Sequence, residues 1–141
     1  MWGNAFCMFS FDFDKGEGVL TVKVIGQWTL ADVPPFEKTA SAHYGAVRAG
    51  YGSLRVLIDN TEAALFTQDV IGALTEAGSR LGRGDDRIAT LVKSSLMKLQ
   101  MKRILPEEMA GVFVSRDEAV TWLTADADEG SSGGLARDVA A

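Results

Sequence analysis

Leu54-Arg55-Val56-Leu57-Ile58-Asp59 is a short apolar run with one arginine inside it and a carboxylate at its end. Aliphatic and β-branched residues in a run of this length, preceded by glycines and followed by polar residues, indicate a buried β-strand. Buried strands of this kind are typical of parallel sheets that helices cover. The run therefore predicts an α/β fold, and helices are expected on either side of it in the sequence.

Helical spacing of apolar residues is found both before and after this strand. Before it, Pro34-Pro35 fit the first turn of a helix that Gly50 ends. After it, Thr67 is placed to cap a helix whose core face extends from Val70 to Leu81. Ser94 or Ser95 can cap a third helix, and a fourth begins after Ser115.

The remaining strands are predicted from alternation and β-branched content. Residues 5–13 alternate, with the odd-numbered phenylalanines on one face, and residues 19–25 are apolar and β-branched, so the two form a hairpin. Short apolar strands follow at 88–92 and 111–114. The order ββαβαβαβα predicts a mixed sheet, with an antiparallel hairpin at one edge and mostly parallel strands beyond it.

One domain is expected from a chain of 141 residues, 47% of which are hydrophobic. We predict that residues 1–125 form this domain. Residues 126–141 contain the linker-like Gly130-Ser131-Ser132-Gly133-Gly134 and are predicted to be a disordered tail.

Charge and hydropathy exclude several function classes. The net charge of −5 argues against a dedicated nucleic-acid binder. No apolar run approaches the roughly 18–20 residues of a membrane span, and the absence of a basic residue before Lys15 argues against a signal peptide. Cys7 and His43 are single, so neither a disulfide nor a His/Cys metal site is expected. We therefore expect a cytoplasmic protein without a cofactor.

The element order, together with four short motifs, resembles a known group of proteins. The motifs are Gly26–Asp32 (GQWTLAD), Leu57-Ile58-Asp59, Ser94-Ser95-Leu96 and Asp117-Glu118-Ala119. They resemble the bacterial SpoIIAA-like proteins, also labelled STAS/SEC14, which are small relatives of the STAS (anti-sigma-factor antagonist) domain. The resemblance covers about residues 5–124 and implies the SpoIIAA-like (STAS-like) fold.

The resemblance also implies a regulatory position. STAS antagonists carry a serine at the start of the helix after the central strand, and a partner kinase phosphorylates it. The matching stretch here is Thr67-Gln68-Asp69, in which Gln68 stands in place of the serine and cannot be phosphorylated. The resemblance therefore predicts a non-enzymatic regulatory or protein-binding module that lacks this phosphoserine switch.

Asp59 and Asn60 are expected to begin a polar loop at the carboxyl end of their strand, where α/β folds place functional groups. An alternative is that the Asp59 carboxylate merely caps loop amides. The starts of the Thr67 and Ser94 helices should lie toward the same end of the sheet, because each follows a parallel strand.

The third helix combines an apolar face with a basic one. Met97, Met101 and Ile104 cluster toward the core, flanked by Leu96 and Leu105. Cations surround Leu99 on the other side, and no acidic residue occurs between positions 93 and 106. This face is either an ordinary solvated surface or a docking site, and the amides of the helix start can hold a phosphate or carboxylate. The predicted binding residues are Asp59, Asn60, Thr67, Gln68, Ser94, Ser95, Lys98, Leu99, Lys102 and Arg103.

Two other functions, a ligand carrier and a hydrolase, are weighed against a protein-binding module. A carrier of an anionic lipid or nucleotide-like ligand would use the same end of the sheet and would need a cavity of more than roughly 300 Å³. A hydrolase is disfavoured because His43 has no recognisable nucleophile partner, and a partly buried structural role is expected for it. The glycine-rich stretch 82–86 lacks a phosphate-loop pattern and is expected to be a turn. The strand at the N-terminal edge could also pair with a second copy and form a homodimer.

Overall fold

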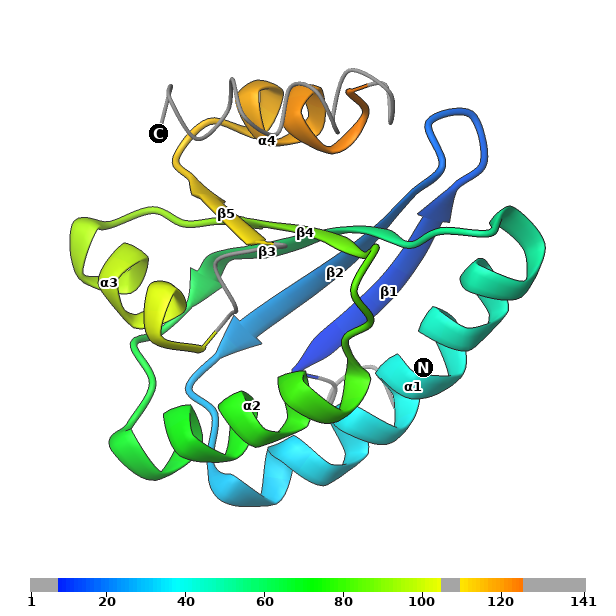
Figure 1. The fold of residues 1–141 in the computed structure, drawn as a ribbon. Coiled ribbons are helices and arrows are strands. Elements are labelled where there is room, and N and C mark those ends of the chain that lie inside the picture. The colour runs from blue at the N-terminus through cyan, green and yellow to red at the C-terminus, as the bar shows by residue number, and fades with distance from the viewer. Residues whose placement is uncertain (1–7, 105–109, 126–141) are drawn as a thin grey trace.

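In the part of the chain that the structure describes, five strands form one sheet in which the spatial order and the chain order coincide, as Figure 1 shows. The computed structural model describes residues 8–104 and 110–125. The predicted tail, the first strand residues 5–7 and the end of the third helix at Leu105 lie outside the described residues. The elements are β1 (Phe9–Asp14), β2 (Val19–Gly26), the short 3-10 helix η2 (Leu30–Asp32), α1 (Val33–Tyr51), β3 (Arg55–Ala63), α2 (Gln68–Leu81), β4 (Arg87–Leu91), α3 (Ser95–Ile104), β5 (Ala110–Phe113) and α4 (Arg116–Leu123).

The pairing of the strands confirms the predicted mixed sheet. β1 and β2 form an antiparallel hairpin, and every later neighbour pair is parallel. Gly18, at φ 70°, closes the hairpin turn, because this left-handed backbone conformation strains any residue with a Cβ. The Asp14 carboxylate stabilises the same turn by accepting from the Gly16 and Glu17 amides at 2.8 and 3.1 Å.

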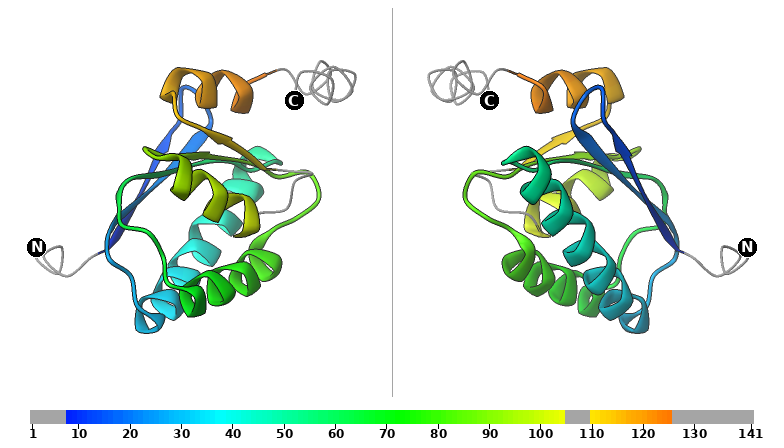
Figure 2. Two further views of the ribbon diagram at one scale, coloured as in Figure 1. Left: turned by 90° about the vertical axis from the view of Figure 1, so that its left-hand side faces the viewer. Right: turned by 90° about the vertical axis from the view of Figure 1, so that its right-hand side faces the viewer.

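The helices divide between the two faces of the sheet. α1, α2 and α3 cover one face, and α4 covers the other, which is clearest in Figure 2. The larger core lies on the three-helix side and is continuous from the β1–β2 hairpin to α3. Phe9, Phe11 and Phe13 of β1 pack against this core, as their alternation predicts.

Buried aromatic rings connect the hairpin to α1. The Trp28 side chain is fully buried, and its indole nitrogen donates to the Met8 carbonyl at 3.3 Å. The Phe36 ring lies edge-on to the Trp28 ring at a centroid distance of 5.2 Å. These contacts hold α1 against the sheet. Within the described chain, the outer edge of β1 pairs with no other strand.

A buried ion pair anchors the turn between α2 and β4. The Asp86 carboxylate is 3% exposed and accepts from Arg48 Nε at 3.2 Å, from Arg48 Nη2 and from the Arg83 amide at 2.8 Å. The stretch 82–86 is therefore a turn, as predicted, and Asp86 connects it to α1.

Candidate functional site

β3 is longer than the apolar run that predicts it. The expectation that the strand ends at Asp59 and a polar loop follows is wrong, because β3 continues to Ala63. β2 supplies the extra pairing, with Ile25 opposite Glu62 and Gly26 opposite Ala63. Main-chain pairing, which does not depend on side-chain polarity, thus extends the strand into a polar segment.

A β-bulge interrupts this extension. The register changes from Lys23 opposite Asp59 to Ile25 opposite Glu62, so β3 carries one residue more than β2 between these pairs. The Asp59 carboxylate accepts from both the amide and the hydroxyl of Thr61, at 2.9 and 2.6 Å. Asp59 therefore binds local groups, as the capping alternative expects, although these groups belong to a bulge instead of a loop.

The bulge changes which side chains at the end of β3 reach the main core. Asn60 is 3% exposed and donates from Nδ2 to Met101 Sδ of α3 at 3.0 Å. After the bulge, Ala63 packs against the core, whereas Glu62 is exposed and pairs with Lys23 at 2.6 Å. In an unbroken strand Glu62 would share the face of Asn60, because side chains alternate.

Asp59 and Asn60 consequently belong to opposite faces of the sheet. Leu57 packs in the cluster beneath α4, and Asp59, two residues later, shares that face. Asn60 faces α3. The structure does not bring these two predicted site residues together.

The start of α2 lies at the surface. Thr67 occupies the N-cap position, as predicted, but its hydroxyl donates to the Asp69 carboxylate and accepts no helix amide. Asp69 also accepts from the Val70 amide at 2.8 Å. The hydrogen bond from Thr67 is the main reason why the pKa of Asp69 lies below its ordinary value. Gln68 is exposed beside them.

α3 has the two faces that its sequence predicts, with one exception. Ser94 caps the helix by accepting from the Met97 amide at 3.1 Å. Met97, Met101 and Ile104 are buried. Leu96, expected to flank the core, is instead 61% exposed, and Leu99 is 57% exposed. On the outer side of α3, Ser95, Lys102 and Arg103 are exposed and Lys98 is half-buried.

A glutamine joins α3 to the segment that leads into α2. The Gln100 amide accepts from the Phe66 amide at 2.9 Å and donates to the Phe66 carbonyl at 2.8 Å. This clamp places the starts of α2 and α3 toward the same end of the sheet, as expected from the parallel strands (Figure 1). Sequence reasoning missed Gln100, because nothing in its neighbourhood signals a partner 34 residues away.

Four exposed large hydrophobic residues lie in the segments that follow β3, β4 and β5. Leu65 follows β3, Leu96 and Leu99 lie on the helix after β4, and Val114 follows β5. The other exposed large hydrophobics of the described residues are Leu30, in the short helix η2 after β2, and Tyr51, at the end of α1. We call Leu65, Leu96, Leu99 and Val114 the apolar edge.

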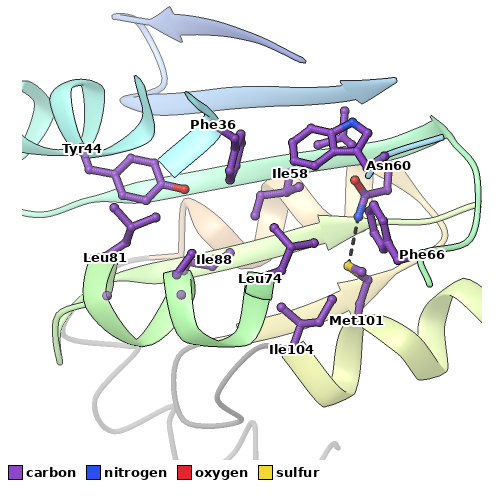
Figure 3. A pocket seen from close by; sticks show the side chains of 15 residues that line it. Phe36, Tyr44, Ile58, Asn60, Phe66, Leu74, Leu81, Ile88, Met101 and Ile104 are labelled. Atoms are coloured by element: carbon purple, nitrogen blue, oxygen red, sulfur yellow. Dashed lines mark hydrogen bonds between the residues drawn. The ribbon is translucent and has the colours of Figure 1, made fainter. Parts of the chain in front are cut away.

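A cavity of about 70 Å³ lies between the sheet, α1, α2 and α3 (Figure 3). Its described lining is almost entirely apolar, with Asn60 and Tyr44 as the polar exceptions and no charged side chain. This volume is well below the roughly 300 Å³ expected of a carrier. The lining therefore gives no support to an anionic lipid or nucleotide as its ligand.

His43 is exposed, although a partly buried position was expected for it. Its ring stacks on the Phe11 ring at a centroid distance of 4.6 Å and an interplanar angle of 4°. Within residues 8–104 and 110–125, no group of three His, Cys, Asp or Glu side chains could hold a metal ion. None of the described helices is long and apolar enough to span a membrane.

Comparison with solved structures identifies the fold. No protein-family model and no curated protein matches this chain. An uncharacterized protein of the DUF3478 family from Shewanella loihica PV-4, with a SpoIIAA-like fold, superposes with a TM-score of 0.56 at 18% identity, over 82% of this chain and 91% of its own. An anti-sigma factor antagonist from Mycobacterium paratuberculosis gives a TM-score of 0.50 at 18% identity, over 82% of this chain and 93% of its own. The chain thus has the SpoIIAA-like fold that its motifs suggest.

Proposed function

We propose that this chain is a non-enzymatic, STAS-like regulatory module that acts in the cytoplasm and binds a protein partner through its apolar edge. The observation that carries the proposal is that four of the six exposed large hydrophobics of the described chain lie in the segments that follow β3, β4 and β5, parallel strands whose carboxyl ends are at the same end of the sheet. Clustered exposed apolar side chains mark interaction surfaces more often than scattered ones do. The similarity to an anti-sigma factor antagonist, a protein named for its effect on another protein, supports the same class of function.

The charges around the apolar edge indicate the chemistry of the partner. Lys98, Lys102 and Arg103 lie on α3 beside Leu99, and no acidic residue occurs between positions 93 and 106. The protein as a whole carries a net charge of −5, so this basic helix is a local exception. We therefore infer a partner that presents an apolar groove bordered by acidic side chains.

We do not expect a phosphoserine at the start of α2 to regulate the binding of the partner. Gln68 stands where the resemblance to STAS antagonists places the serine, and it has no hydroxyl. The neighbouring Thr67 hydroxyl already donates to Asp69. Control of binding by phosphorylation would have to act at another position or on the partner.

Photo-crosslinking inside the native host tests the docking surface. A photoreactive phenylalanine analogue at Leu99 should give a discrete crosslinked protein. The same analogue at Tyr51, which is 52% exposed at the other end of the fold, should not. Adding Lys98→Glu and Lys102→Glu should abolish the product without changing the melting temperature. Equal crosslinking from both positions, or a product that survives the charge reversal, would contradict the proposal.

A further inference from the structure

The cavity beneath α3 contains a buried polar atom for which the described residues provide no hydrogen-bond partner. Asn60 Oδ1 has no hydrogen-bond partner among the described residues. The other end of the amide is held, because Nδ2 donates to Met101 Sδ at 3.0 Å. Figure 3 shows Asn60 extending into the space between the sheet and α3, with that bond as the dashed line.

An unpaired buried carbonyl oxygen lowers folding stability by roughly 1–3 kcal/mol, and such atoms are rare in folded proteins, so its presence needs an explanation. Asn60 lies within the β3 bulge, between Asp59 and Thr61, whose side chain and amide are hydrogen-bonded to each other. Bulges are over-represented beside active sites. An apolar residue of the same size would fill this position without the cost.

The remaining lining specifies what could pair with this oxygen. The Tyr44 hydroxyl points into the same space from the opposite end of the view in Figure 3, and the walls between are aliphatic and aromatic. No charged side chain of the described residues lines the cavity, so these residues would not compensate an ionised group inside it. The occupant that the described lining fits is neutral, mainly apolar, and able to donate a hydrogen bond to Asn60 Oδ1.

We propose that this cavity is a binding site for a small neutral alcohol, whose hydroxyl donates to Asn60 Oδ1 while its hydrocarbon part packs against Phe36, Leu74 and Ile88. The volume of about 70 Å³ is smaller than the roughly 150 Å³ cavity that binds benzene in an engineered protein, and it suits a short aliphatic chain. This site is separate from the apolar edge, and the two proposals can fail independently.

Two isomeric probes isolate the hydroxyl donor. 1-Butanol and 1-methoxypropane have the same heavy atoms, but only the alcohol can donate a hydrogen bond. In a titration followed by NMR of the intact protein, the Asn60 side-chain amide and the Met101 methyl should shift with both probes. The alcohol should bind about threefold to tenfold more tightly, as expected for one neutral hydrogen bond.

Separate variants test the hydrogen-bond acceptor Asn60 Oδ1 and the volume of the cavity. Asn60→Leu should remove the preference for the alcohol and still bind the ether. Gly78 lines the cavity and an added Cβ would meet only the Ile104 carbonyl, at 3.9 Å, so Gly78→Ala should fold and weaken both probes. Gly72→Ala on the exposed side of the same helix, where a Cβ meets nothing within 4 Å, is the matched control and should leave both affinities unchanged.

Several results would overturn the site. One is equal affinity of the wild type for the two probes. A second is that the NMR signals of Asn60 and Met101 do not shift when either probe is added. A third is that Gly78→Ala and Gly72→Ala change the affinities for the probes by the same amount. Ordered water alone is the remaining alternative: a crystal structure from butanol-soaked protein that still shows only water on Asn60 Oδ1 would also reject the proposal. If Asn60→Leu fails to fold, the comparison of the two probes and the two glycine variants decides the question.

Discussion

The Asp59 carboxylate accepts both hydrogen bonds that Thr61 can donate, from its amide at 2.9 Å and from its hydroxyl at 2.6 Å. This pair joins the two residues that flank Asn60 at the β3 bulge, after which Glu62 faces solvent. Without that acceptor, the half-buried Thr61 would lose both of these hydrogen bonds.

Asp59→Ala should therefore lower the free energy of unfolding by about 1–3 kcal/mol, the usual cost of a polar group left unpaired. Asp59→Asn keeps an acceptor oxygen in the same place and should cost clearly less. Urea denaturation of the two variants measures the difference. Equal stability of Asp59→Ala and the wild type would show that the bulge does not need the carboxylate.

Of the three ion pairs in the described chain, the one between Arg48 and Asp86 should cost the most folding stability when one partner is removed. Asp86→Ala leaves a guanidinium that is only 23% exposed without its carboxylate, and we expect a loss of about 3 kcal/mol. Glu37→Ala breaks a pair whose arginine is 57% exposed and should cost at most about 1 kcal/mol. Chemical denaturation of both variants provides the comparison, and similar losses would refute the ranking.

Glu37 should make stability depend on pH. Its carboxylate accepts from Arg80 Nε at 2.6 Å and from Nη2 at 2.7 Å, and these hydrogen bonds lower the pKa of Glu37 from its ordinary value of 4.5. The folded protein thus binds this proton more weakly than the unfolded chain does. The stabilisation is present above pH 4.5 and is lost as the pH falls through the lowered pKa.

Thermal melts of the wild type and Glu37→Gln across this pH range test the linkage. The difference in stability should be largest near neutral pH and should disappear in acid. In an Arg80→Gln background the difference should be small at every pH. A difference that does not change with pH would mean that the hydrogen bonds of Glu37 do not depend on its charge.

The two faces of α3 should separate stability from binding. Met97→Ala and Ile104→Ala remove buried side chains and should each cost about 2–5 kcal/mol. Leu96→Ala and Leu99→Ala remove exposed side chains and should stay within about 0.5 kcal/mol of the wild type, because neither side chain is buried in the core. Differential scanning calorimetry distinguishes the pairs; a large loss from Leu99→Ala would place that residue in the core instead of the docking surface.

Local patterns were sufficient to predict most of the fold. Element order and helix faces depend on periodicity within one segment, which is why the burial of Met97, Met101 and Ile104 follows from their spacing. The partners of helix caps are harder to predict from sequence. Thr67 occupies the expected N-cap position of α2, but its hydroxyl donates to Asp69 and does not accept from a helix amide. Leu96 was misplaced because it borders the core-facing arc, where a small rotation of the helix decides exposure.

The site depended on relationships that no single segment contains. The extension of β3 follows from its register with β2, and the alternation of side chains along that strand puts Asp59 and Asn60 on opposite faces, although the sequence analysis places both in one loop. The Gln100 clamp on Phe66 and the contact of Asn60 with Met101 join residues 34 and 41 positions apart. Polar side chains in such positions look the same in sequence as solvated ones.

The coincidence of strand order with chain order has a consequence for how the molecule folds. Within the described residues each strand pairs only with its neighbours along the chain, so none of these pairings must wait for a distant part of the sequence. The antiparallel hairpin closes the shortest loop and is the cheapest pairing to form first, and each later βα unit then adds one strand to a growing edge. We therefore expect single-exponential refolding at rates typical of mixed α/β domains, with substitutions in the β1–β2 hairpin slowing folding and substitutions in α4 mainly speeding unfolding.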